Sequence, residues 1–311
     1  MMLCETVVVE LTVEGLLLLD KPSGPTSHDM VASVRKMCGG AKAGHTGTLD
    51  PLAIGLLVIL VGRATKLAPF IPGDPKVYEG TILLGISTNS MDMEGEVISE
   101  GVFGGGTDEV GEAFASLVGD LEQVPPMFSA VKYRGSPLYH FARRGEKVPR
   151  KSRKVRIYRS EMTAFRPAGR KAEVDFIIEC SPGTYIRELA DRVGDMLGCG
   201  GTLSRLRRTA SGPFSVEHAL SVEEISACLS GGGHCLLPLD VAVEGYKRAE
   251  VADAWLKAAR NGATLEEMMI ETGDKGMVEG DTVAVFAERG LMGIHRVVAT
   301  NPLSLRPLRI L

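Results

Sequence analysis

Four segments of the chain carry apolar residues with the spacing of β-strands. Residues 15–20 are almost entirely apolar, as in a buried strand, and residues 76–84 alternate between apolar and polar positions. Residues 155–165 and 172–180 are strand-like as well. Because helical patterns lie between these segments, the chain is expected to combine strands with helices.

Besides residues 107–118, two segments carry apolar residues at helical spacing. Thr26 or Ser27 is expected to cap the first helix, which Gly39-Gly40 ends. Thr184 is expected to cap the second, which ends at Gly198. The apolar positions of the two helices are Met30, Val31, Val34 and Met37, and Ile186, Leu189, Ala190, Val193 and Leu197.

A polar loop, residues 42–51 (KAGHTGTLDP), precedes an apolar segment that reaches Val61. Its glycines leave room for a ligand to approach the backbone. Two interpretations of Asp50 are open. It caps a helix that begins at Pro51, which the local sequence favours, or it is a functional carboxylate at the end of a binding loop.

Two further segments indicate how the chain is organised. Residues 123–150 are long, basic and contain prolines, which is typical of a surface insertion. A glycine-rich break at residues 230–233 predicts a domain boundary near 231–235. The tail beyond it contains further strand patterns at 282–286 and 291–298.

Composition restricts the class of protein. The 311 residues suffice for two domains, and 44% apolar with 24% charged residues is ordinary for a soluble globular chain. The apolar run 52–61 is too short to span a bilayer, and the N-terminus does not resemble a signal peptide, so a cytoplasmic protein is expected. The six cysteines form no C-x-x-C pair, and no cofactor motif is present, so neither a metal nor a cofactor is predicted.

The distribution of charge is more informative than its sum. The formal net charge is −4, yet residues 143–159 contain nine basic residues and one acidic residue. A second set of arginines follows at positions 187, 192, 205, 207 and 208. A local basic surface on an acidic body is typical of proteins that bind nucleic acid, although a solvated charged face is the alternative.

Several motifs occur in a fixed order and together resemble the TruB family of bacterial tRNA pseudouridine-55 synthases. They are GLLLLDKP (15–22), AGHTGTLDPL (43–52), GRATK (62–66), KVY (76–78), PMFSAVK (126–132), GTYIR (183–187) and LRR (206–208). A weaker likeness to an RNA-binding PUA domain rests on residues 238–240, 279–283 and 305–309.

The resemblance implies roles for individual residues. Asp50 would be the catalytic group, with Arg187 as its ion-pair partner and nucleotide contact. The remaining nucleotide contacts would be His45, Tyr78, Tyr185 and Leu206. The supporting or phosphate-binding residues would be Lys21, Lys66, Arg143, Arg144, Arg150, Arg207 and Arg208.

The family also implies an α+β fold, in which a mixed, mainly antiparallel central sheet is followed by a small PUA-like β-barrel. The expected organisation is an extension at residues 1–14, a catalytic domain at 15–235 with an RNA clamp at 123–150, and an RNA-binding domain at 236–311. The partner would be the T-stem-loop of tRNA, bound by a monomer whose pocket takes up an everted uridine.

Two other functions stay open. A dyskerin-type enzyme would need a separate guide RNA, but residues 127–135 (MFSAVKYRG) of the insertion favour a stand-alone enzyme. The other alternative is a protein that binds or folds RNA without turnover. Asp50 argues against it, because binding alone does not need this carboxylate and a negative charge near RNA phosphates weakens affinity.

Overall fold

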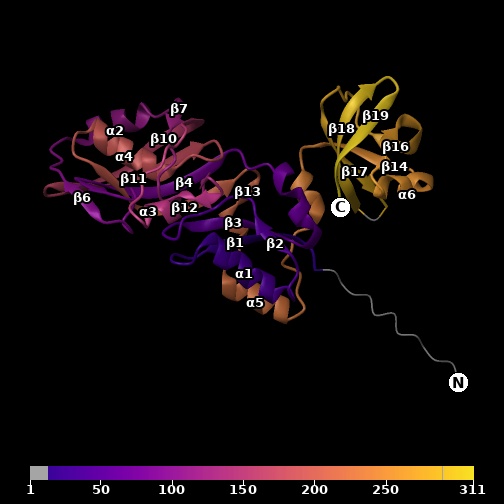
Figure 1. Ribbon diagram of the computed structural model, residues 1–311, viewed down its shortest axis with the longest axis horizontal. Helices are drawn as coiled ribbons and strands as arrows, with labels where there is room; N and C mark the ends of the chain where they lie inside the picture. The colour runs from indigo at the N-terminus through magenta and orange to yellow at the C-terminus, as the bar shows by residue number, and fades with distance from the viewer. Residues whose placement is uncertain (1–12, 289) are drawn as a thin grey trace.

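The computed structural model describes residues 13–288 and 290–311. Most of the predicted N-terminal extension, residues 1–12, lies outside the described residues. Two β-sheets lie side by side along the long axis of the molecule (Figure 1). None of the helices in the described ranges is long and apolar enough to cross a bilayer.

The first sheet has nine strands, in the order β1-β3-β12-β4-β11-β10-β7, with β2 beside β3 and β13 beside β12. Its strands are β1 (Gly15–Lys21), β2 (Ala43–His45), β3 (Ile54–Val61), β4 (Lys76–Leu84), β7 (Gly119–Gln123), β10 (Arg153–Ala168), β11 (Lys171–Cys180), β12 (Gly201–Ser211) and β13 (Phe214–Ser215). Among the described residues of this sheet, β3 and β12 form the single pair of strands that runs parallel. This arrangement confirms the predicted mixed, mainly antiparallel α+β fold.

Helices cover the sheet at both of its ends. α1 (Ser27–Met37) and α5 (Val222–Ser230) pack near β1 to β3, whereas α2 (Thr107–Ala115) and α4 (Ile186–Met196) pack near β10 and β12 (Figure 1). Thr26 caps α1 as predicted, since its hydroxyl accepts a hydrogen bond from the Asp29 amide at 3.1 Å.

The predicted cap of α4 is wrong by one residue. Tyr185 occupies the cap position, and its amide donates to Gln123 Oε1 at 2.9 Å. The Thr184 hydroxyl instead donates to the Ser181 carbonyl at 2.8 Å. A glutamine from a distant strand therefore replaces the local cap, which no pattern within residues 180–198 indicates.

Two short hairpins form separate two-stranded sheets among the described residues. β5 (Ile86–Thr88) pairs with β6 (Val97–Glu100), and β8 (Lys132–Tyr133) pairs with β9 (Ser136–Pro137), which leads into α3 (Leu138–Ala142). The second hairpin and α3 occupy the middle of the predicted insertion.

The second sheet has six strands, in the order β15-β19-β18-β17-β14-β16. They are β14 (Lys247–Val251), β15 (Leu265–Glu266), β16 (Ile270–Gly273), β17 (Thr282–Ala287), β18 (Gly290–Thr300) and β19 (Leu303–Ile310), with α6 (Leu256–Arg260) between β14 and β15. β17 and β18 confirm the two strands predicted in the tail. The small β-rich unit is compatible with a PUA-like domain.

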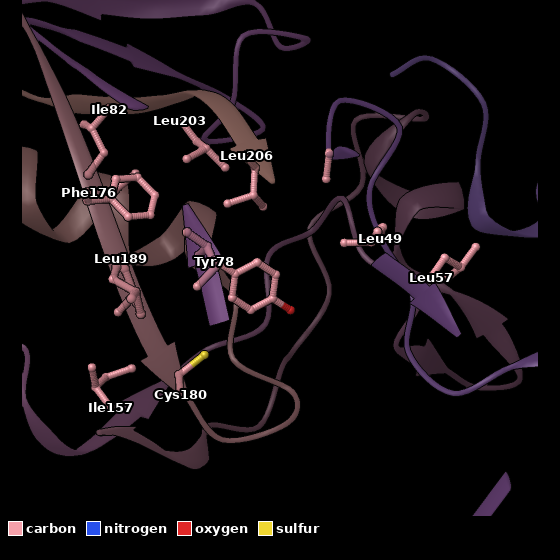
Figure 2. Packing of buried hydrophobic residues seen from close by; sticks show 14 of the residues in the cluster. Leu49, Leu57, Tyr78, Ile82, Ile157, Phe176, Cys180, Leu189, Leu203 and Leu206 are labelled. Atoms are coloured by element: carbon pink, nitrogen blue, oxygen red, sulfur yellow. The ribbon is translucent and has the colours of Figure 1, made fainter. Parts of the chain in front are cut away.

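Strands β1 and β3 are buried on both faces. On one face, Leu17, Leu57 and Ile59 join a core that includes Tyr78, Phe176 and Leu206 (Figure 2). On the other face, residues of β1 and β3 join a core that includes side chains of the second sheet. The members of that shared core include Leu16, Leu18, Leu56, Val58, Leu60, Ala284, Phe286, Leu291 and Ile294.

Candidate functional site

A cavity of about 420 Å³ opens beside the loop that precedes β3. Five of the predicted site residues line it, although they come from four separate parts of the chain. Asp50 belongs to the loop, Tyr78 to β4, Tyr185 and Arg187 to the start of α4, and Leu206 to β12. The order of strands in the sheet brings the residues of β4, β12 and α4 together, because β4 and β12 are neighbours and α4 packs on β12.

Asp50 is held by an ion pair at the wall of this cavity. Its Oδ2 lies 2.9 Å from Arg187 Nε, and the Asp50 side chain keeps 35% of its surface exposed. No helix follows Asp50, because a turn closes between Asp50 and Ala53 and β3 begins at Ile54. The interpretation of Asp50 as a helix cap is therefore wrong.

Arg187 also binds a second carboxylate. Its Nη1 lies 3.2 Å from Asp92 Oδ2, and its guanidinium donates to the carbonyls of Ser90 at 2.9 Å and Phe128 at 2.8 Å. Removal from bulk water raises the pKa of Asp50, the Arg187 guanidinium opposes that rise, and Asp92 adds to it. The net shift of the Asp50 pKa is upward, so burial outweighs the opposing effect of the Arg187 cation.

Side chains from three elements fix the loop that carries Asp50. On β1, Lys21 Nζ donates to the carbonyls of Pro51 at 3.2 Å and Ala53 at 2.7 Å. At the start of α1, the Ser27 hydroxyl donates to the Leu49 carbonyl at 2.9 Å and accepts from the Leu49 amide at 2.8 Å. These bonds satisfy backbone groups that would be costly to bury unpaired.

The third support of the loop is Arg208 on β12. Its guanidinium donates to the carbonyls of Leu56 at 2.8 Å and Gly47 at 3.0 Å. Arg208 and Lys21 are 1% and 0% exposed, so they hold the loop and do not present a charge to solvent. Of the two roles predicted for them, support fits their positions and phosphate binding does not.

Gly55 permits the parallel contact between β3 and β12. Its φ of 98° is unfavourable for residues with a side chain, and a Cβ there would collide with the Arg208 carbonyl. The close approach brings Arg208 under the loop. A glycine at this position is therefore part of how the sequence builds the site.

Two aromatic rings line the cavity. Tyr78 is 6% exposed and lies at the margin of the core, with its hydroxyl turned away from Phe176 and Leu189 (Figure 2). Tyr185 is fixed by Gln123, which also donates to the Tyr185 carbonyl at 3.1 Å, and by the Arg153 guanidinium 4.3 Å from its ring centroid. Burial raises the pKa of Tyr78, so its hydroxyl keeps its proton at neutral pH.

The other predicted residues lie outside the cavity lining. His45 is half-buried on β2, and burial lowers its pKa. Lys66 donates to the Ile310 carbonyl at 3.2 Å, and Arg207 pairs with Asp20 at 2.7 Å. The remaining three, in the insertion, are exposed: Arg143, Arg144 and Arg150.

The residues of this site that were not predicted from the sequence include Lys76, Asp92, Gln123 and Arg153. Lys76 lines the cavity two positions before Tyr78, so strand alternation places both side chains on one face and offered a usable signal. No sequence pattern marks Asp92 or Gln123, because each joins the site by contacting a residue far away in sequence: Asp92 contacts Arg187, and Gln123 contacts Tyr185.

Comparison with known proteins gives one consistent family. Residues 35–186 match the N-terminal domain of the TruB family pseudouridylate synthases, and residues 187–244 match the C-terminal domain of tRNA pseudouridylate synthase B. The tRNA pseudouridine synthase B of Alkaliphilus oremlandii is 40% identical over 282 residues, which cover 90% of this chain and 92% of that protein. The protein of the same name from Geobacillus thermodenitrificans is 38% identical over 305 residues, covering 96% and 99%.

Solved structures share the fold. A chain in the crystal structure of a Cbf5-Nop10-Gar1 complex superposes with a TM-score of 0.71 at 26% identity, covering 95% of this chain and 84% of that chain. A chain of an H/ACA RNP bound to a substrate RNA containing 2′-deoxyuridine gives a TM-score of 0.70 at 24% identity. The likeness extends over both sheets, since it covers nearly the whole chain.

Proposed function

The chain belongs to the TruB family and is a tRNA pseudouridine synthase, and we propose that it converts uridine 55 of the tRNA T-loop with Asp50 as the catalytic group. One observation carries this proposal. The Asp50 carboxylate is fixed by Arg187 at 2.9 Å in the wall of a cavity that Tyr78, Tyr185 and Leu206 also line.

The reaction breaks the bond between ribose C1′ and uracil N1 and joins C1′ to C5. Because no atom or electron is gained overall, side chains of the protein can supply the chemistry. Asp50 would act at the sugar or at the base. Attack on C1′, attack on the base and removal of a sugar proton are all open to a carboxyl group at this position.

The target uridine must leave its stack to reach Asp50. Extrusion of a base costs a few kcal/mol, which contacts in the pocket must return. A cavity of about 420 Å³ lies in the range of small-ligand sites. We propose that Tyr78, Tyr185 and Leu206 contact the everted nucleotide, and that His45 fills the space left in the RNA stack.

The basic insertion supplies the proposed contact with the RNA backbone. Arg143, Arg144 and Arg150 are exposed, and the same segment reaches the cavity, which Ser129 and Val131 line. We propose that residues 123–150 close over the T-stem-loop as a clamp, that residues 236–311 extend the RNA contact, and that a cytoplasmic monomer does this without a guide RNA.

Pseudouridine formation on purified tRNA tests this function. Unmodified tRNA is incubated with the protein alone, and the product is mapped chemically at each uridine. Product at position 55 in the absence of a guide RNA supports the proposal. Product only with a guide RNA would indicate the dyskerin type, and binding without product would leave an RNA-binding protein.

A further inference from the structure

The cavity that contains Asp50 is also lined by a buried cation, Lys76. Lys76, the first residue of β4, is 8% exposed and lines the same cavity as Asp50 and Tyr78. The other buried lysine near the site, Lys21, donates to three backbone carbonyls. Within the described ranges, Lys76 Nζ has no such acceptor.

The neighbours of Lys76 do not balance its charge. Its Nζ lies against Gly47, where an added Cβ would be only 2.5 Å away. The titratable and charged groups that act on it are Arg208 from β12, Cys180 from β11 and His45 from β2, and none is a carboxylate. Burial, with a smaller contribution from Arg208, lowers the pKa of Lys76 to about 8, so most molecules keep the ammonium at pH 7.

We propose that the Lys76 ammonium donates a hydrogen bond to a carbonyl oxygen of the everted uracil and stabilises negative charge on the base during isomerisation. This inference rests on the proposed function. It adds a catalytic residue to the site, with the pyrimidine carbonyl as its ligand.

The depth of Lys76 favours the base over a phosphate. Asp50 is half-buried, whereas Lys76 is buried with 8% of its surface exposed, so Lys76 is the more shielded of the two from solvent. The sugar is tied to an RNA backbone that must stay at the mouth of the cavity, and the base extends inward from it. The first acceptors that a nucleotide brings to the deep end are therefore the oxygens of its uracil.

The chemistry requires charge stabilisation at that end. When the C1′–N1 bond breaks, its electron pair stays on the base and is shared by N1 and the two carbonyl oxygens. C5 then forms the bond to C1′, C5 loses its proton, and N1 gains one, so atoms and electrons balance. Attack on the base by Asp50 would also place charge on these oxygens. Lys76 transfers no proton in either route and acts as a fixed hydrogen-bond donor.

The test compares Lys76→Met with the wild-type enzyme in single-turnover reactions on unmodified tRNA. Methionine keeps an unbranched apolar stem and removes the charge. Loss of one such donor is expected to slow the rate about 100- to 1,000-fold, with the Kd for tRNA within about threefold. Lys36→Met, which removes an exposed lysine of α1, is the matched control and should react like the wild type.

A pH series adds a readout that a purely structural role would not produce. The ratio of the wild-type rate to the Lys76→Met rate should fall as pH rises through about 8, because only the wild type then loses the ammonium. Lys21 also has a pKa of about 8, but it is present in both proteins and cancels in this ratio. Lys76→Arg keeps a charge and should retain more activity than Lys76→Met.

Three results would overturn the inference. A Lys76→Met rate within about threefold of wild type would remove Lys76 from catalysis. If Lys76→Met bound tRNA more weakly, and the slope of log K against log salt fell by the amount expected for one lost phosphate contact, Lys76 would be assigned to the RNA backbone. A ratio that does not change with pH would indicate a structural effect. If the wild type makes no pseudouridine, the proposed function itself fails, so the two failures are distinguishable.

Discussion

Arg187 is the residue on which the geometry of the site depends most. Its side chain is 4% exposed and lies between Asp50 and Asp92, which would repel each other without it. A buried guanidinium of this kind is stable only because carboxylates and carbonyls surround it. The same contacts aim Asp50 and oppose the rise of its pKa.

Arg187→Met should therefore affect both stability and the pH profile. Removing one member of a buried ion pair costs about 3–5 kcal/mol of unfolding free energy. Without the cation that opposes its rise, the pKa of Asp50 moves further up, so activity should fall at pH 7 and recover partly at higher pH. Urea unfolding and rates of pseudouridine formation between pH 6 and 9 measure the two effects. An unchanged pH profile would contradict the role given to Arg187.

We expect the stability of the second sheet to fall in acid because of His295 on β18. It is 1% exposed, both ring nitrogens lack a partner among the described residues, and burial lowers its pKa from 6.5 to about 4. Above pH 6.5 the folded and unfolded states are both neutral here. As pH falls to about 4, only the unfolded state gains the proton, which costs up to about 3 kcal/mol of stability.

The matching experiment uses His295→Leu. This variant should be at least as stable as the wild type at pH 7.5 and should lose less stability between pH 6.5 and 4, measured by urea unfolding followed by far-UV circular dichroism. Equal pH dependence in the two proteins would mean that His295 does not titrate in this range.

Residues with chemical signatures were easier to predict than residues that support them. The ordered motifs identified Asp50 and Arg187, and the structure brings them together. Lys21 and Arg208 were grouped with phosphate-binding residues because a basic side chain looks the same in a sequence whether it faces RNA or a backbone carbonyl. Only the fold shows that their donors are already used.

At the level of elements, hydrophobic spacing predicted strand β4 more accurately than the cap of helix α4. The pattern of 76–84 gave β4 with its exact bounds, because alternation reports directly on one buried face. The cap of α4 was missed because Gln123, 62 residues away, supplies the bond to the Tyr185 amide. Likewise, residues 132–142 form a hairpin and a short helix inside a segment predicted only as an insertion.

The insertion should contribute to affinity through phosphate contacts. The triple variant Arg143→Ala, Arg144→Ala and Arg150→Ala should weaken tRNA binding and lower the slope of log K against log salt by about 2–3, since each lost contact removes about 0.7–0.9. Filter binding at several salt concentrations measures this slope. Arg166→Ala, which removes an exposed arginine paired with Asp175, is the control. A slope equal to wild type would move the RNA contact elsewhere.

At the scale of the whole molecule, the two sheets share one core. Leu18 and Leu60 of the first sheet pack in the same cluster as Phe286 and Ile294 of the second, and all are nearly fully buried. The Leu16 amide also donates to the Leu237 carbonyl, beyond the predicted domain boundary. The C-terminal sheet therefore stabilises β1 and β3, next to the catalytic loop.

A chain ending at Cys235 tests this dependence. Without the second sheet, one face of β1 and β3 would be exposed, so we expect the melting temperature to fall by about 10 °C or more, or the protein to aggregate. Calorimetry of the full-length protein should show one main transition. A truncated chain that melts within about 3 °C of full length would show that the sheets are independent modules.

The central claim is that one carboxylate carries the chemistry, and Asp50→Asn tests it most directly. Single-turnover pseudouridine formation and tRNA affinity are measured on the same preparation. We expect no detectable product from Asp50→Asn, while its Kd for tRNA stays within about tenfold, or 1.4 kcal/mol, of wild type. Turnover near the wild-type rate would contradict it.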